Sequence, residues 1–512
     1  MIKGNSLAVP LLHTKMFGMR KVENTMNKGK VLLVGAGPGD IGLITLKGIE
    51  AIKQAEVILY DRLANPKLLE FAPDECEFIY CGKLPDRHTM RQEKINEVLV
   101  SKSLEGKRVV RLKGGDPGVF GRVGEEAEAL ANHNIEFEMI PGISSGMAAP
   151  LYAGIPVTHR RFGETFAIVT AHDKSVEGIP VLDWQSLANG IDTIAFYMGI
   201  SNLPNICNNL LKHGKDATTP VILIQWGTFG RQKTLQGTLS TIAEQATRLN
   251  FTNPAITLVG DIVSLKNKIS WFEKKPLFGR QILLVRTGVG QSELAQKLTS
   301  LGADVYEYPK WKKIESTDNE QTLKHISEYE QILFTAPESV NDFFNLLIRE
   351  KIDIRAIKAK IYAASTKSLR ALNMRGIMAD IERDLIDGSK LLVVGDGRYI
   401  PQYEKGELFI TSKLQNDDKF EPVIKLMLKE AKLDTIIFPS SQSIGVFLAE
   451  LENGVIFSKS ILETSEIICM GEKTAQTAIA NAIVPSKIIK KPNKESVIDC
   501  LLDKDITLKI EK

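Results

Sequence analysis

Short apolar runs alternate with segments of helical spacing along most of the chain. The runs 30–34, 56–60, 107–112 and 136–140 have the pattern of buried strands, and residues 43–54 have that of a helix. Most of these strands are followed by a loop that contains glycine. Alternation of this kind predicts α/β architecture.

The pattern is interrupted at residues 273–279 by charged residues, Pro276 and Gly279, and a second α/β unit starts with the run 281–285. This second unit contains a weak internal repeat. Residues 334–340 are echoed by 438–444, and 365–372 by 471–478. The similar offset of the two pairs predicts two similar lobes. A chance match of such short strings is the alternative.

Bulk composition limits the class of protein. A length of 512 residues suggests about two to four domains, and 43% hydrophobic with 25% charged residues is typical of a globular protein. A net charge of +3 provides no global field for nucleic acid. The five cysteines form no CxxC pair, which predicts reduced thiols and no metal site. Without an apolar run of membrane-spanning length or a signal-peptide core, we expect a cytoplasmic protein with no membrane partner.

Three of the predicted strands end in glycine-rich loops: residues 35–40 (GAGPGD), 114–117 (GGDP) and 141–146 (PGISSG). The first loop, with Asp61 as ribose ligand, invites a dinucleotide interpretation. Against it, Asp40 stands where the third glycine should be, and Pro38 has no N–H for a pyrophosphate. Ligands of open α/β sheets bind at the carboxyl ends of strands, so three such loops predict a small-molecule site. Simple tight turns are the alternative.

Taken in order, these and further motifs resemble uroporphyrinogen-III C-methyltransferase from about Lys30 to Phe272. The motifs are VGAGPGD (34–40), LYDRL (59–63), RLKGGDP (111–117), FGR (120–122), PGI (141–143), GIPVTHR (154–160) and YMG (197–199). The resemblance implies a two-lobed tetrapyrrole methylase domain that binds S-adenosylmethionine between its α/β lobes, unlike Rossmann-type methyltransferases. We expect an N-terminal tail at 1–28, this domain at 29–273 and a second domain at 279–512.

The resemblance also implies roles for single residues. Asp61 would be the proton acceptor and Lys83 the proton donor. This suits the chemistry, because a pyrrole carbon that attacks a methyl sulfonium must then lose a proton. The alternative is that Asp61 caps a turn and Lys83 is a solvated charge. Cofactor contacts are implied for Pro38, Gly114, Gly115, Asp116, Val119, Ser144, Ser145, Met198, Gly227 and Ala255.

A substrate with many carboxylates needs cations near the cofactor loops. The candidates are Arg62, Arg111, Lys113, Arg122, His159 and Arg160. Each would elsewhere be a solvated surface charge. The sequence departs from the family pattern at Gly118, where a bulky residue is usual, and at Leu84, where an arginine is usual.

From about Gly279 onward the chain resembles uroporphyrinogen-III synthase, a bilobal α/β enzyme without cofactor that closes hydroxymethylbilane. The motifs are VR (285–286), FT (334–335), SV (339–340) and GEKTA (471–475). The hydroxyls suited to substrate carboxylates are those of Thr335, Ser339, Ser368 and Thr474, with helix N-capping as the alternative. Phe409 lies near the position where the family usually has a tyrosine. The proton donor of this half is therefore unassigned. The other candidates for it are Tyr362, Tyr399 and Tyr403.

The expected function is therefore dual. The C-terminal half would make uroporphyrinogen III from hydroxymethylbilane, and the N-terminal half would methylate it at C2 and C7 to precorrin-2, for sirohaem or cobalamin. S-adenosylmethionine is the expected methyl donor, the synthase half needs no cofactor, and a homodimer through the methyltransferase domain is allowed. One alternative is a methyltransferase with a non-catalytic C-terminal binding module, and another is a nicotinamide-dependent dehydrogenase.

Overall fold

The computed structural model of the chain describes residues 28–82, 90–171, 181–316, 319–381, 390–397, 406–454, 456–502 and 507–508. The chain forms two compact units, one ending at Ser145 and the other beginning at Gly146, and each is described by itself. Both are built of sheets covered by helices, which confirms the α/β prediction. None of the described helices has the length and apolar character needed to cross a bilayer.

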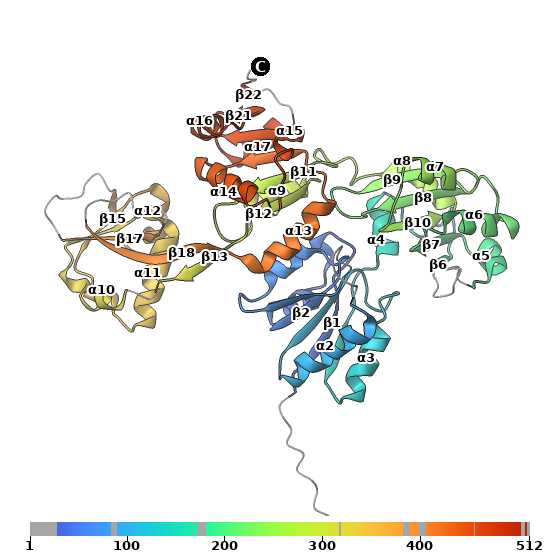
Figure 1. Ribbon diagram of the computed structural model, residues 1–512, viewed down its shortest axis with the longest axis horizontal. Helices are drawn as coiled ribbons and strands as arrows, with labels where there is room; N and C mark the ends of the chain where they lie inside the picture. Colours follow the sequence, from blue (N-terminus) through green and yellow to red (C-terminus); the bar gives the residue numbers. More distant parts are fainter. Residues whose placement is uncertain are drawn as a thin grey trace, which may run out of the picture. The chain divides into compact units, whose positions relative to one another are not determined.

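The first unit is a five-stranded parallel sheet in the order β3-β2-β4-β1-β5. Helices α2 and α3 lie side by side over one face of it (Figure 1), where their apolar residues join the core of β1, β2 and β4. The elements are β1 (Val31–Gly35), α1 (Leu46–Lys53), β2 (Val57–Tyr60), β3 (Glu77–Tyr80), α2 (Gln92–Leu104), β4 (Val109–Lys113), α3 (Val123–Asn132) and β5 (Phe137–Ile140).

Local sequence explains these elements. The apolar run of β1 is buried at every position, as expected of a central strand in a parallel sheet that is covered on both faces. Helix α1 begins after Thr45, whose hydroxyl accepts the backbone N–H of Gly48 at 3.0 Å. The four strands predicted in this region are confirmed as β1, β2, β4 and β5. The predicted helix is shorter than expected, because residues Ile41–Leu43 form a separate single turn.

The second unit starts with a mixed sheet in the order β6-β7-β10-β8-β9, with an apolar core on each face. Only β6 and β7 pair in parallel; the other neighbours are antiparallel. The elements are α4 (Ser145–Tyr152), which begins at the last residue of the first unit, β6 (Phe166–Thr170), α5 (Trp184–Gly190), β7 (Thr193–Tyr197), α6 (Leu203–Lys212), β8 (Pro220–Gln225), β9 (Lys233–Thr238), α7 (Ile242–Arg248), β10 (Ala255–Val259) and α8 (Lys266–Ile269).

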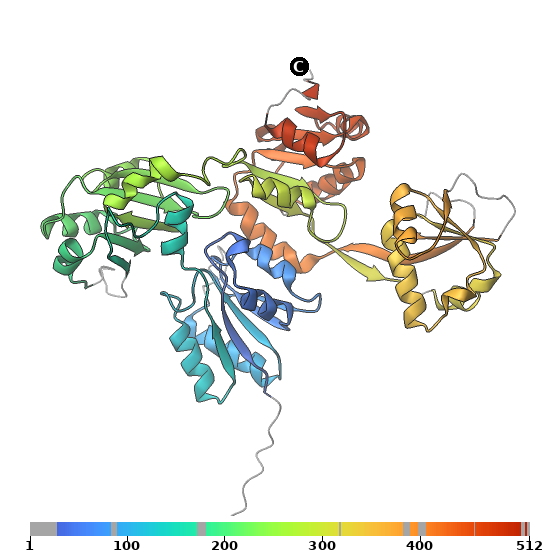
Figure 2. The ribbon, with the colours of Figure 1, turned by 180° about the vertical axis from the view of Figure 1, so that it is seen from behind.

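Two more sheets follow, in the orders β12-β11-β19-β20-β21-β22 and β13-β18-β17-β14-β15-β16. The chain passes from one to the other through β13 and returns through β18, which pair antiparallel as a ribbon (Figure 2). The strands are β11 (Gln281–Val285), β12 (Asp304–Tyr308), β13 (Trp311–Glu315), β14 (Gln331–Phe334), β15 (Lys360–Ala363), β16 (Asp380–Ile381), β17 (Leu391–Asp396), β18 (Glu407–Asn416), β19 (Thr435–Phe438), β20 (Glu466–Met470), β21 (Lys487–Ile489) and β22 (Thr507–Leu508). The helices are α9 (Glu293–Ser300), α10 (Glu320–Lys324), α11 (Pro337–Arg349), α12 (Thr366–Asn373), α13 (Glu421–Glu430), α14 (Ser441–Glu452), α15 (Ile461–Thr464), α16 (Glu472–Ala480) and α17 (Lys494–Leu501).

The internal repeat found in the sequence corresponds to matching structural elements. Strand β14 with helix α11 in one sheet matches β19 with α14 in the other, and the second repeated segment begins α12 and α16. In each sheet the two strands involved are parallel neighbours, β14 with β15 and β19 with β20. The sequence echo therefore marks a strand–helix–strand–helix unit that occurs in both lobes.

Backbone and side-chain contacts join the two sides of the predicted boundary at residues 273–279. The Gly279 N–H donates to the Gly230 carbonyl at 3.0 Å, and Arg231 Nε lies 3.5 Å from Asp304 Oδ2. The Arg231 guanidinium also stacks on the Trp226 ring, 4.0 Å from its centroid. The second compact unit therefore includes residues on both sides of this segment, and the boundaries at 28–29 and 273–279 stay predictions.

Candidate functional site

Three neighbouring strands of the first sheet carry the predicted cofactor loops. Strand β1 lies between β4 and β5, and all three run parallel, so their carboxyl ends meet at one edge. Seven of the ten predicted cofactor residues follow these strands. They are Pro38 after β1, Gly114, Gly115, Asp116 and Val119 after β4, and Ser144 and Ser145 after β5.

Backbone pairing holds these loops together. Gly37 and Gly115 exchange two N–H···O bonds of 3.2 and 2.7 Å, and the Ala36 N–H donates to the Lys113 carbonyl at 2.7 Å. A Cβ at Gly142 would come within 2.4 Å of the Gly115 carbonyl oxygen, so only glycine fits there. A Cβ at Gly115 itself would meet nothing closer than the Ser145 nitrogen at 3.9 Å. The loop backbones are therefore close-packed at Gly142 and leave room for a Cβ at Gly115, which is itself buried.

The Asp116 carboxylate connects two of the loops. Its Oδ1 accepts the Gly118 N–H at 2.7 Å, and its Oδ2 accepts the Gly142 N–H at 2.9 Å. Gly118, the departure from the family pattern noted in the sequence, thus donates its N–H to this carboxylate. Because both carboxylate oxygens already hold backbone donors, Asp116 fixes the spacing of the loops after β4 and β5.

Asp61 follows β2, the other neighbour of β4, and its turn packs against the loop after β4. A Cβ at Gly114 would lie 2.5 Å from the Leu63 Cβ. Asp61 Oδ1 accepts the N–H groups of Leu63 and Ala64 at 3.0 and 3.2 Å, which is the capping role considered from the sequence. Its Oδ2 instead faces Arg111 Nη2 at 3.5 Å. The side chain is 28% exposed, so this carboxylate is accessible to a ligand.

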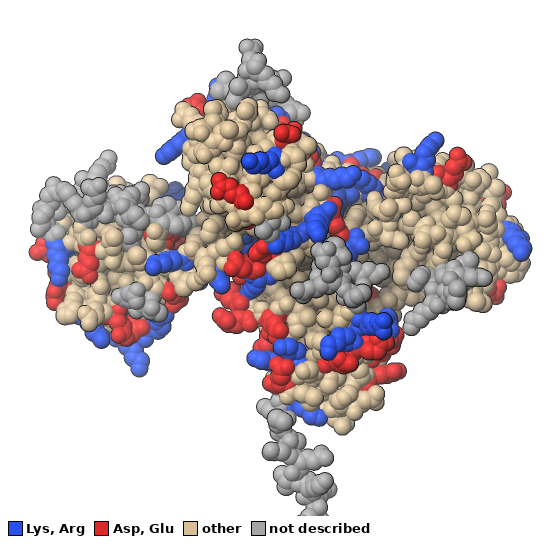
Figure 3. All heavy atoms as spheres, in the orientation of Figure 1, with Lys and Arg blue, Asp and Glu red and all other residues tan. Residues whose placement is uncertain are grey.

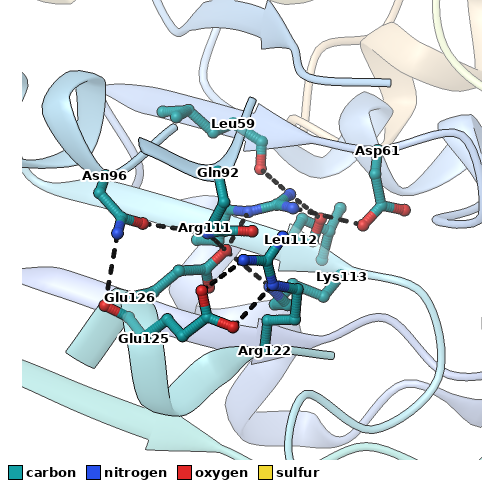
Figure 4. A network of polar contacts seen from close by, with 10 residues as sticks. All are labelled: Leu59, Asp61, Gln92, Asn96, Arg111, Leu112, Lys113, Arg122, Glu125 and Glu126. Carbon is teal, nitrogen blue, oxygen red and sulfur yellow. Dashed lines mark hydrogen bonds and ion pairs between the residues drawn. The ribbon is translucent and has the colours of Figure 1, made fainter. Parts of the chain in front are cut away.

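Arg111 and Lys113 lie on the buried face of β4 that is covered by α3, two positions apart and therefore on the same side of the strand. Both contact the Glu126 carboxylate of α3: Lys113 Nζ at 2.6 Å and Arg111 Nε at 3.2 Å from Oε1 (Figure 4). Gln92 of α2 donates to the same oxygen at 3.2 Å. Two residues predicted to bind substrate carboxylates are thus held by a carboxylate of the protein.

Burial and charge affect the titration of this cluster. Burial opposes ionisation of Arg111, but the Asp61 and Glu126 carboxylates outweigh it and raise the arginine's pKa. Burial, together with the neighbouring arginine, lowers the pKa of Lys113. Arg111 is therefore the permanently charged group that faces Asp61.

The other three predicted cofactor residues belong to the second unit. Met198 follows β7 with a positive φ of 55°, Gly227 follows β8, and Ala255 begins β10. A Cβ at Gly227 would lie 2.4 Å from the Ala149 Cβ of α4. The Tyr197 hydroxyl accepts the Gly146 N–H at the start of α4 at 2.5 Å. The end of β7 and the loop after β8 are therefore packed against α4.

The remaining predicted substrate cations are on the surface. Arg62 and Arg160 are exposed, and Arg122 is held by a bidentate pair with Glu125. His159 Nδ1 accepts the Arg161 N–H at 3.1 Å, and this histidine and Arg160 line an open surface hollow. Basic and acidic side chains are interspersed over the visible face in Figure 3. These residues lie at the surface, whereas Arg111 and Lys113 are buried.

Three of the four predicted synthase hydroxyls have hydrogen-bond partners within the protein. The Thr335 hydroxyl donates to the Val394 carbonyl at 3.2 Å, that of Ser368 lies 2.9 Å from the Ser365 hydroxyl, and that of Thr474 donates to the Met470 carbonyl at 3.0 Å. Ser339 is fully buried, and its hydroxyl has no hydrogen-bond partner among the described residues. None of the four is a helix N-cap, because the N-caps of α11, α12 and α16 are Ala336, Ser365 and Gly471, so the N-capping alternative does not describe these hydroxyls.

Burial bears on which residue could be the proton donor of the synthase half. Phe409 of β18 is fully buried and packs its ring 5.3 Å from that of Phe343, in the apolar core of its lobe. Tyr362 is fully buried as well. Tyr399 and Tyr403 lie outside the described residues, as does Lys83, the predicted proton donor of the other half. Position 409 is therefore a core position rather than a surface from which a hydroxyl could reach a substrate.

Sequence reasoning missed Glu126. In the sequence Glu126 follows Glu125, which is exposed, in a glutamate-rich stretch of helix. From the sequence alone it would be taken for a residue that faces solvent. A signal was present: an Arg-x-Lys pair in an otherwise apolar strand requires a buried anion. The α3 spacing places Glu126 on the same face as Leu130, one turn away.

Two family models match the chain. Residues 30–243 match the model of tetrapyrrole (corrin/porphyrin) methylases, and residues 292–421 match that of uroporphyrinogen-III synthase HemD. The glycine loops, Asp61 and the Arg111 cluster all lie within the first match.

Two relatives align with nearly the whole chain. It is 48% identical over 453 residues to a uroporphyrinogen-III C-methyltransferase of Bacillus subtilis (strain 168), covering 88% of this chain and 93% of the relative. It is 36% identical over 510 residues to the porphyrin biosynthesis protein HemD of Ruminiclostridium josui, covering 93% and 98%. Among solved structures, uroporphyrin-III C-methyl transferase of Thermus thermophilus complexed with S-adenyl homocysteine is 35% identical, covers 46% of this chain and 100% of that one, and has a TM-score of 0.40.

Proposed function

The chain belongs to the uroporphyrinogen-III C-methyltransferase family, with a uroporphyrinogen-III synthase HemD domain behind its methylase domain, and we propose that it methylates uroporphyrinogen III at C2 and C7 to precorrin-2. The methyl donor would be S-adenosylmethionine. The main support from the structure is the edge of the first sheet, where the Asp61 turn packs on Gly114 and joins the three glycine-rich loops after β1, β4 and β5. A proton acceptor thus adjoins the predicted cofactor loops.

Two features of the loops support S-adenosylmethionine as the ligand. Three loops meet at one edge of the sheet, and at Gly115 a Cβ would meet no atom closer than 3.9 Å. The residues of the first unit that would hold the cofactor are Pro38, Gly114, Gly115, Asp116, Val119, Ser144 and Ser145. The contacts of Met198, Gly227 and Ala255, which belong to the second unit, stay predictions. The bound cofactor supplies an electrophilic methyl group on a positively charged sulfur.

Asp61 would take the proton that the ring must lose after a pyrrole carbon has been methylated. Its Oδ1 is fixed by two backbone N–H groups, so the orientation of Oδ2 is set by the turn. Arg111 Nη2 lies 3.5 Å from Oδ2, the oxygen that would accept the proton, and so helps to orient it. Lys83 remains the proposed proton donor.

The test is methyl transfer in a single turnover by Asp61→Asn, which preserves the shape of the side chain. Loss of a general base typically lowers the rate about a hundredfold to ten-thousandfold, while binding of S-adenosylhomocysteine should be unchanged. A parental rate in the folded variant would make Asp61 a structural cap only.

For the second domain we propose cyclisation of hydroxymethylbilane to uroporphyrinogen III without a cofactor, so that one half makes the other's substrate. The family match over residues 292–421 supports this. The assay is incubation of the full chain with hydroxymethylbilane alone, followed by chromatography of the oxidised porphyrins. Predominance of the type III isomer is expected, since a cleft that folds the bilane can select by positioning. Type I alone would favour a non-catalytic binding module.

A further inference from the structure

The buried cluster between β4 and α3 links a fully buried carboxylate to the proposed base. Glu126 is 0% exposed, and its Oε1 receives Arg111 Nε, Lys113 Nζ and Gln92 Nε2. From the opposite end of the same guanidinium, Arg111 Nη2 reaches Asp61 Oδ2. One rigid, planar group therefore spans the two carboxylates.

The remaining contacts of Arg111 fix the plane of its guanidinium. Nη1 donates to the carbonyls of Leu112 at 3.1 Å and Leu59 at 3.4 Å, which belong to the neighbouring strands β4 and β2. With Nε on Glu126 and Nη1 on the sheet, Nη2 is the group directed toward Asp61 (Figure 4). Without the Glu126 carboxylate, Nε of the Arg111 guanidinium would lose its only carboxylate partner among the described residues.

The cluster is poorly explained by stability alone. Glu126 Oε2 is buried without a hydrogen-bond partner among the described residues. A half-satisfied buried carboxylate is expensive, and an apolar side chain would serve better where only packing mattered. Its neighbours on α3, Ala127 and Leu130, show the apolar alternative.

We propose that Glu126 is a positioning residue for methyl transfer, which holds the Arg111 guanidinium so that Nη2 faces the carboxylate of Asp61. This rests on the proposed function, in which Asp61 accepts the proton. Glu126 acts only through Arg111, whereas Arg111 orients the reacting carboxylate. Lys113 shares Glu126 but has no contact with Asp61 among the described residues, so its part is to balance charge in the buried cluster.

The test compares Glu126→Gln with Gln92→Met in the full-length enzyme. Glu126→Gln removes the charge that holds Arg111 and keeps the shape. Gln92→Met removes another contact to the same oxygen without touching Arg111. We expect single-turnover methyl transfer to fall about tenfold to a hundredfold in Glu126→Gln, the scale expected when a catalytic group is displaced by about an ångström. The rate of Gln92→Met and the Kd for S-adenosylhomocysteine in both variants should stay within about twofold of the parent.

Arg111→Lys provides a second measurement, because it keeps a positive charge beside Glu126 and so protects folding. A lysine ammonium cannot span Glu126 and Asp61 together, so the same loss of rate is expected. Because Glu126 acts through Arg111, the Glu126→Gln/Arg111→Lys double variant should be no slower than the slower single variant. A structural role would instead give additive losses.

Three outcomes would overturn the proposal: a parental rate in Glu126→Gln or Arg111→Lys, additive losses in the double variant, or an equal loss of rate in Gln92→Met. The Asp61→Asn variant, measured in the same assay, distinguishes failure of the positioning role from failure of the proposed function. If Asp61→Asn is slow and Glu126→Gln is not, only the positioning role fails. If Asp61→Asn reacts at the parental rate, the proposed base fails, and the positioning role fails with it.

Discussion

Replacement of Asp116 by asparagine is expected to weaken binding of S-adenosylhomocysteine. The two oxygens of this carboxylate hold the N–H groups of Gly118 and Gly142, which belong to the loops after β4 and β5. Asparagine offers one carbonyl oxygen, so one N–H would face an amide NH2 group, a second donor. The contact that sets the spacing of the two loops would therefore be lost at one end.

The magnitude follows from the lost bond. A hydrogen bond to a charged acceptor contributes about 1.5–3 kcal/mol, and the lower end applies because Asp116 is only partly buried and water can replace part of it. If the ligand binds only the closed arrangement of the loops, the cost appears in its affinity. A loss of about 1.5 kcal/mol corresponds to roughly tenfold in Kd.

Titration calorimetry with S-adenosylhomocysteine measures this directly, and scanning calorimetry reports the thermal stability. Asp183→Asn is the matched control. Asp183 also accepts two donors, the N–H and hydroxyl of Ser186, but it caps α5 and belongs to no predicted cofactor loop. Because asparagine caps a helix about as well as aspartate, both the thermal stability and the affinity should stay close to those of the parent. An unchanged Kd in a folded Asp116→Asn variant would refute the assignment of these loops to the cofactor.

Three further predictions concern packing and burial. Gly142→Ala should abolish binding of S-adenosylhomocysteine, because its Cβ would overlap the Gly115 carbonyl, whereas Gly124→Ala, with nothing within 4 Å, should bind normally; equal affinities in calorimetry would contradict this. Phe409→Tyr should lower the stability of its lobe by about 1–3 kcal/mol, because a hydroxyl enters an apolar core; a melting temperature in scanning calorimetry equal to that of the parent or higher would contradict this. Burial raises the pKa of Cys81 to about 11 and that of Cys469 to about 12, so native protein at neutral pH should react slowly with iodoacetamide and denatured protein fast, as followed by mass spectrometry; rapid native labelling of either thiol would disprove it.

Local sequence was sufficient for the fold class, because the pattern that specifies a buried parallel strand is a property of a few consecutive residues. The runs that became β1, β2, β4 and β5 are examples. The internal repeat could also be recognised in the sequence, because both lobes contain the same order of strands and helices. The division of the chain at Ser145 was not, because it depends on which elements pack together rather than on any composition change near that residue.

Within the candidate site, the residue types in the loops could be chosen from the sequence, but their partners could not. Asp116 was expected to face the cofactor, and the structure gives both of its oxygens to backbone donors from two loops. Arg111 and Lys113 were expected to bind substrate carboxylates, and the structure pairs them with Glu126 from a later helix. Charge identifies what a side chain can bind, but only packing decides which oppositely charged group is near.

The sequence by itself therefore determined the α/β architecture, the glycine loops at strand ends and the resemblance to both enzyme families, because these are encoded in local spacing. Tertiary structure decided which cations are buried, which carboxylate holds them, and that Phe409 is a core residue. Those facts depend on contacts between β4 and α3, or between β18 and α11, whose residues are separated in the sequence. The free energy of a buried charge or hydroxyl depends on the groups that surround it after folding, and no local pattern specifies them.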